Sequence, residues 1–204
     1  LVGQPITGST ACGPGPEGVI AHLPAEQAPS VQAFLDREPP WKFEIVTHTS
    51  AKLHRQVLLD LPDIDSIYDA HVELTRRMLR QMLFPIWVQS VEKYADRKPQ
   101  ELLAAVAAGN DAENFLFVLN KADQLAKAQA DGNDGDAITD LRGDYAKRIA
   151  HVLDRAQPPA VYVISAQQPD QFDFPSLRAK LSQQKPPASV RQSIAAGLCE
   201  NRAG

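Results

Sequence analysis

The alternation of short apolar runs with longer amphipathic segments most constrains the fold of this 204-residue chain. Short runs rich in β-branched and aromatic residues predict strands, and apolar residues recurring every three or four positions predict helices. Strands that alternate with such helices are typical of an α/β protein with a largely parallel sheet. We therefore expect one sheet with helices on both faces, built from strands near residues 18–23, 42–49, 55–60, 84–90, 114–119 and 160–165.

The segments between these strands carry the helical pattern. Helices are expected within residues 68–83, 99–110, 136–156 and 175–184, with one short helical piece between the first two strands. Pro99 and Pro175 suit first helical turns, where a backbone N–H has no intrahelical partner. The acidic stretch ADGNDGDA (130–137) is expected to be a flexible loop. It fails the calcium-loop pattern, because Asp136 and Arg142 stand where Gly and Glu are required.

Composition excludes several classes of protein. The hydrophobic fraction of 44% suffices for a core, and the net charge of −4 gives no basic excess for nucleic-acid phosphates. There is no run of about 18 apolar residues, so no transmembrane segment is expected. Cys12 and Cys199 match no metal-ligand spacing, which suits a reducing compartment, and we expect a cytoplasmic protein.

Polar residues stand at the ends of three expected strands. Asp60 ends QVLLD, Asn120-Lys121-Ala122-Asp123 follow NFLFVL, and Ser165-Ala166 end AVYVI. In a parallel sheet the carboxyl ends of the strands share one edge, and ligands bind there. These separate stretches should therefore converge on one crevice. Read alone, Asn-Lys-Ala-Asp could equally be turn chemistry after a strand.

The order of LLDLPD, NFLFVLNKAD and VYVISA resembles that of the Ras-like and Era-like regulatory GTPases, over roughly residues 1–185. The resemblance implies a three-layer, P-loop NTPase-like (Ras-like) fold, with the 18–23 and 42–49 strands as antiparallel neighbours at one edge. It also implies GTP or GDP as ligand, Mg²⁺ as cofactor and a possible protein effector. Residues 186–204 would be a C-terminal tail or the start of a following segment.

The resemblance assigns roles to the residues at the strand ends. Asp123 would accept hydrogen bonds from the N1–H and C2 amino group of guanine, a donor pair that adenine cannot supply. Asn120 would brace the neighbouring loops, and the apolar stem of Lys121 would cover the purine face. The N–H of Ala166 would meet guanine O6, with Ser165 supporting that loop. An ATP-specific enzyme is a poorer alternative, because the cluster suits guanine.

The phosphate side departs from the family pattern. The family has Asp-x-x-Gly after its magnesium-side strand, whereas this chain has Asp60-Leu61-Pro62-Asp63. Asp60 can still reach Mg²⁺ through water. A carboxylate at Asp63 would repel a γ-phosphate unless it turned away or met a cation. Ile64 stands where a water-orienting Gln would follow, so the catalytic residues are unknown.

The N-terminus departs further. GQPITGST (3–10) nearly supplies the phosphate-loop pattern GxxxxGK[ST], with Gly3, Gly8 and Thr10 in register and Ser9 in the Lys position. The following ACGPGPEG cannot form the helix on which such a loop depends. We therefore expect a GTPase domain over residues 1–185 that lacks its first strand, phosphate loop and most of its first helix. Thr10 would then lie in the first switch, available to Mg²⁺, and a degenerate phosphate loop is the alternative.

Two functions follow from the sequence. The first is a guanine-nucleotide-binding regulatory GTPase that hydrolyses GTP to GDP in the full-length protein. The second is a degenerate, non-hydrolysing domain of the same fold that acts as a partner-binding module. A GxxxxGK[ST] segment upstream of Leu1 would distinguish them.

Overall fold

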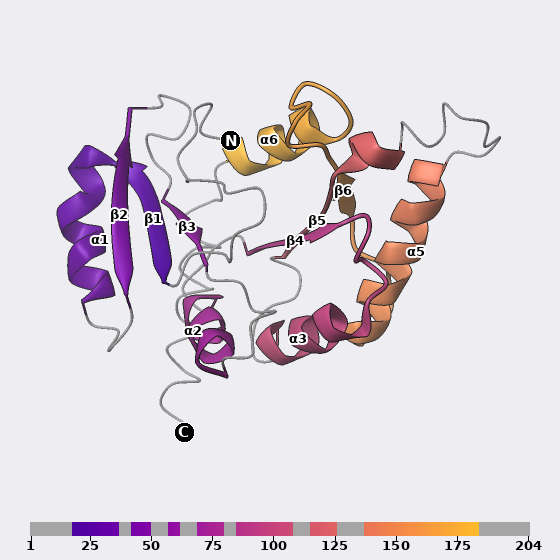
Figure 1. The fold of residues 1–204 in the computed structure, drawn as a ribbon, viewed down its shortest axis with the longest axis horizontal. Helices are drawn as coiled ribbons and strands as arrows, with labels where there is room; N and C mark the ends of the chain where they lie inside the picture. The colour runs from indigo at the N-terminus through magenta and orange to yellow at the C-terminus, as the bar shows by residue number, and fades with distance from the viewer. Residues whose placement is uncertain are drawn as a thin grey trace. The chain divides into compact units, whose positions relative to one another are not determined.

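The computed structural model describes residues 18–36, 42–49, 57–61, 69–79, 85–107, 115–125 and 137–183. These residues form a mixed α/β protein (Figure 1) that divides into two compact units, Leu1–Thr75 and Arg76–Gly204. The elements follow in the order β1 (Val19–Pro24), η1 (Ala25–Gln27), α1 (Ala28–Leu35), β2 (Phe43–His48), β3 (Leu58–Asp60), α2 (Asp69–Leu79), β4 (Ile86–Ser90), α3 (Arg97–Ala107), β5 (Leu116–Asn120), α5 (Ala137–Val152), β6 (Val161–Val163) and α6 (Phe174–Ser182).

The first unit is built on a three-stranded sheet in the order β2-β1-β3. Residues of α1 and the sheet form one core around the buried Ala21, Leu23 and Leu35. Side chains alternate along a strand, so Ile20, His22 and Pro24 point to the opposite face of β1. Gly18 precedes β1 where a Cβ would collide with the Lys42 carbonyl, so the close approach of β1 to β2 requires glycine there.

The second unit is a three-layer structure on the parallel sheet β4-β5-β6. Phe174 and Leu177 of α6 pack with Leu116 and Val118 on one face of the sheet. On the other face, residues of α3 and α5 meet the β4 side chains Trp87 and Gln89 around a small cavity. Four of the five β5 residues are buried, as expected for a central strand whose two faces are both covered.

The expected helices and strands are found within the described residues. The prediction of one sheet is not met among the described residues, where the strands form two sheets of three. In each sheet the middle strand, β1 or β5, has partners on both of its edges. The expected layering, with helices on both faces, is present in the second unit.

The predicted orientation of the first two strands was wrong. β1 and β2 are neighbours, but they run parallel, with Val19 opposite Phe43 and His48 opposite Pro24. The cause is α1, which carries the chain back to the starting end of β1 before β2 begins, as a strand–helix–strand crossover does. The antiparallel partner of β1 is β3, with Asp60 opposite Ile20.

Candidate functional site

The carboxyl ends of β4, β5 and β6 lie along one edge of the second sheet. Ser90 is opposite Asn120, and Leu119 is opposite Val163. The polar residues that follow β5 and β6 are therefore brought together, as the sequence predicts for neighbouring parallel strands. The backbone joins the two strand ends further, because Ala122 N–H donates to the Ile164 carbonyl at 3.0 Å.

Asn120 connects these two strand ends through its side chain. Its Oδ1 accepts hydrogen bonds from the backbone N–H of Lys121 at 2.8 Å and of Ala166 at 3.0 Å. Both donors are backbone N–H groups, so the atom that faces them must be the amide oxygen, and this fixes the orientation of the amide. Asn120 thus joins the two loops through its side chain.

Asp123 and Ser165 form a buried polar pair at the same edge. The Ser165 hydroxyl donates to Asp123 Oδ1 at 2.7 Å. Ser165 is 0% exposed and Asp123 is 7% exposed. The Ser165 oxygen also accepts from the Gln168 N–H at 3.3 Å. A carboxylate offers about four acceptor positions, so the hydrogen bond from Ser165 leaves Asp123 with further capacity to accept.

Lys121 has an unusual backbone and an ion pair. Its φ is 70°, in the left-handed region that costs a residue with a side chain about 1 kcal/mol or more. Its Nζ lies 2.8 Å from Glu92 Oε2 on the loop after β4. The hydrogen bond and the charge of Lys121 lower the pKa of the Glu92 carboxyl below its usual value.

Asp173 holds the base of the loop that carries Ser165 and Ala166. Its Oδ2 accepts from the Val163 N–H and from Arg142 Nη2, each at 2.8 Å, and the Asp173 N–H donates to the Val163 carbonyl at 2.9 Å. Asp173 therefore joins the end of β6 to the start of α6 and ties both to α5. We therefore expect the loop geometry at Ser165 to depend on Asp173.

The magnesium-side residues belong to a different part of the chain from this cluster. Asp60 ends β3 in the first unit, so the predicted convergence of all three strand ends stays a prediction. Thr10 and Asp63 lie outside the described residues. Burial raises the pKa of the Asp60 carboxyl, against the opposing charge of His22. Magnesium in nucleotide sites takes one or two carboxylates with phosphate oxygens and water, so Asp60 alone fits that role only beside a bound nucleotide.

Two residues of the site were not predicted. Glu92 lies 29 residues before its partner Lys121, and Asp173 lies 10 residues after its partner Val163, at the N-cap of α6. The run QSVEKYAD, which spans the end of β4 and the loop after it, carries no information about the partner of Glu92. The small cavity beside Trp87, Gln89 and Tyr145 does not include any residue of the cluster.

A scan against protein-family models and a search of curated proteins found no match for this chain. Among the described residues, no group of three or more His, Cys, Asp or Glu side chains is arranged to hold a metal ion. None of the described helices combines the length and apolar character needed to cross a membrane.

Proposed function

We propose that this protein contains a guanine-nucleotide-binding domain of the Ras-like and Era-like regulatory GTPase class, with a P-loop NTPase-like fold. The observation that carries the proposal is the mutual bracing of two loops at one sheet edge. Asn120 Oδ1 binds the Ala166 N–H, and Ser165 binds the Asp123 carboxylate. A turn that only reversed the chain would not need a side chain of each loop fixed on the other.

The chemistry of guanine supports this assignment. Its N1–H and C2 amino group form adjacent donors, and an ionised carboxylate such as Asp123 can accept from both. The Lys121 stem offers an apolar surface for a purine ring. The Ala166 N–H already donates to Asn120 at 3.0 Å, so its proposed contact with guanine O6 would have to share that hydrogen or replace the bond.

Hydrolysis of GTP to GDP in the full-length protein, with Mg²⁺ held on the side of Asp60, is part of the same proposal. The alternative is a non-hydrolysing domain that binds partners, and Asp63 in the place of the family glycine favours it. Measured GTP turnover by a form of the protein that carries GxxxxGK[ST] upstream would separate these two functions.

Substitution of Asp123 tests the base-reading role. Asp123→Asn replaces one acceptor with a donor, which then faces the amino group of guanine. One buried group goes unpaired, so GDP should bind roughly ten- to a hundredfold more weakly. Xanthine has a carbonyl at C2, so xanthosine diphosphate should bind the variant better than the wild type. NMR titration with GDP, xanthosine diphosphate and ADP measures all three affinities, including weak ones.

Asp170→Asn is a matched control, because it makes the same change at a side chain that is 91% exposed. It should leave the order of the three affinities unchanged. An Asp123→Asn variant that stays folded and keeps its preference for GDP would show that residues 120–123 form only a turn.

A further inference from the structure

The loop between β4 and α3, residues 91–96, is held to the candidate base site by its own backbone. The Val91 N–H donates to the Asn120 carbonyl at 3.0 Å, and turns within the loop join Lys93 to Ser90 and Asp96 to Lys93. Val91 is also buried, with 7% of its surface exposed. The start of this loop therefore cannot shift without disturbing the residue that precedes Lys121.

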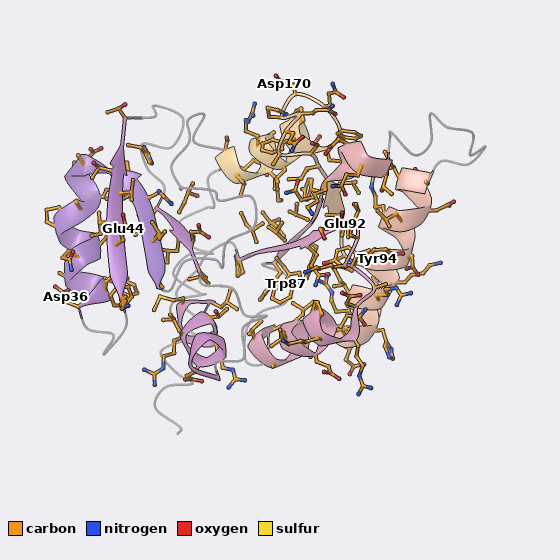
Figure 2. All side chains as sticks on the ribbon, in the orientation of Figure 1. Asp36, Glu44, Trp87, Glu92, Tyr94 and Asp170 are labelled. Carbon is orange, nitrogen blue, oxygen red and sulfur yellow. The ribbon has the colours of Figure 1, made fainter. Side chains whose placement is uncertain are left out.

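The middle of the loop is fixed on α5 through Tyr94 (Figure 2). The ring of Tyr94 meets the buried Tyr145 edge to face at 6.0 Å between centroids, and the Arg148 guanidinium lies 5.8 Å from the Tyr94 ring. Asp144 accepts a hydrogen bond from the Tyr94 hydroxyl and pairs with Arg148 at 2.7 Å. Aromatic and cation–π contacts of this kind favour one orientation of the ring.

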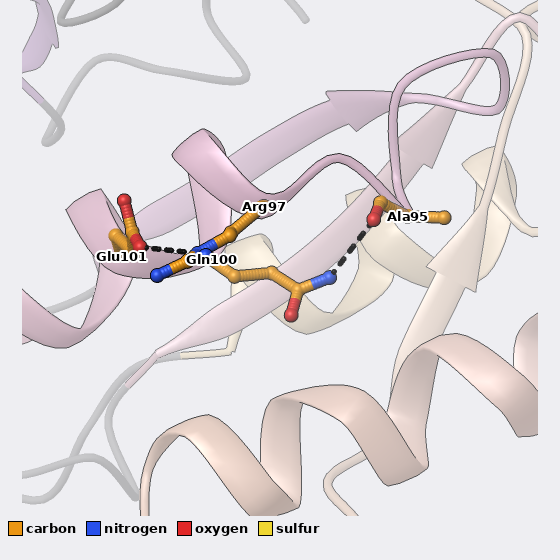
Figure 3. A network of polar contacts seen from close by, with 4 residues as sticks. All are labelled: Ala95, Arg97, Gln100 and Glu101. Atoms are coloured by element: carbon orange, nitrogen blue, oxygen red, sulfur yellow. Dashed lines mark hydrogen bonds and ion pairs between the residues drawn. The ribbon is translucent and has the colours of Figure 1, made fainter.

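The end of the loop is joined to the first turn of α3 (Figure 3). Gln100 Nε2 donates to the Ala95 carbonyl at 3.4 Å, beside an exposed pair of Arg97 and Glu101 at 2.6 Å. The loop is thus attached at its start, middle and end. A loop attached in this way can carry a residue that holds another side chain in a fixed position.

Glu92 is the side chain that this loop presents to the residues around Asp123. Its carboxylate accepts from Lys121 Nζ at 2.8 Å and also from the Gln124 side chain. Glu92 therefore contacts the residues on either side of the Ala122-Asp123 pair. The side chains of Glu92 and Lys121 are 51% and 47% exposed, so both remain accessible to a ligand.

We propose that Glu92 is a positioning residue, which holds the Lys121 side chain over the subsite where the purine ring binds. This inference rests on the proposed function. Without Glu92, the flexible lysine would have to lose its freedom on binding, and the affinity for the nucleotide would fall. Glu92 contributes by restricting Lys121 before the ligand arrives.

A double-mutant cycle tests this role with GDP as the probe. Glu92→Gln should weaken GDP binding to the full 204-residue chain about two- to fivefold, the range for exposed ion pairs. The effect should shrink in high salt, because exposed charges are screened. Lys121→Met keeps the stem and removes the amine, so Glu92→Gln should have no further effect in that background.

Glu101→Gln is the control, because it neutralises a similarly exposed carboxylate that pairs with Arg97 instead. It should leave the affinity for GDP unchanged. An equal effect of Glu92→Gln in both backgrounds would show that Glu92 acts by general support of the fold, and would overturn its positioning role. A wild type that binds GDP and ADP equally would contradict the proposed function itself. If the wild type clearly prefers GDP to ADP but Glu92→Gln binds GDP as tightly as the wild type, only this inference is overturned.

Discussion

His22 is a buried histidine whose two ring nitrogens have no hydrogen-bond partner in the described structure. It lies on the face of β1 opposite to α1 and is 3% exposed. Burial lowers its pKa, outweighing the opposite effects of Asp60 and Glu44, and His48 lowers it further. A buried neutral imidazole of this kind makes stability depend on pH.

The stability of the first unit should fall as the pH drops below about 6.5, the ordinary pKa of histidine. Below that value the unfolded chain takes up a proton at His22 that the folded chain excludes, so protonation favours unfolding. Asp60 acts in the opposite sense at lower pH: burial raises its pKa, so its contribution is largest in acid and declines as the pH rises above its ordinary value.

His22→Leu should remove the histidine contribution, because leucine fills the space without a titrating group. Urea denaturation at about pH 7 and about pH 5.5 can be monitored by NMR at β1 resonances. The stability lost between the two pH values should be smaller in the variant than in the wild type. His151→Leu, at an exposed position of α5, is the matched control. An equal loss of stability in the wild type and in His22→Leu would show that His22 is not the source of the pH dependence.

At the scale of elements, Asp173 links β6, α6 and α5. Asp173→Ala would leave the Val163 N–H and the Arg142 guanidinium without their shared acceptor, at a cost of about 1–3 kcal/mol. The Val163 amide should then exchange its hydrogen faster, and resonances of residues 164–168 should shift with it. Unchanged exchange at Val163 would show that Asp173 does not hold this loop.

Sequence reasoning predicted the elements well where one element's own pattern decides them. The apolar run of β5 and the polar residues from Asn120 to Asp123 are both visible in the sequence, and neighbouring parallel strands brought Asn120 and Ser165 together. The parallel pairing of β1 with β2 could not be predicted from either strand's own pattern. It depends on α1, which carries the chain back to the starting end of β1 before β2 begins. Glu92 was missed for a related reason: an ion pair across 29 residues leaves no local pattern.

At the scale of the whole molecule, the residues proposed to read the base all belong to the second unit, and Asp60 belongs to the first. Guanosine, which has no phosphate, should therefore shift amide resonances near Asn120, Asp123 and Ala166. If Asp60 reaches Mg²⁺ through water as proposed, GDP with Mg²⁺ should shift these and the Asp60 amide as well. Comparison of the two spectra of the 204-residue chain measures both effects. An Asp60 amide that never responds would remove Asp60 from the site.

The left-handed backbone of Lys121 sets stability and selectivity against each other at one position. A glycine there would adopt a φ of 70° without the steric cost that a side chain brings. The chain instead has a lysine, whose amine reaches Glu92. If Lys121 covers the purine ring, glycine would relieve the backbone strain at this position, but lysine makes the better contact with the ligand. Variants selected only for thermal stability should then drift towards glycine at this position and lose discrimination among nucleotides.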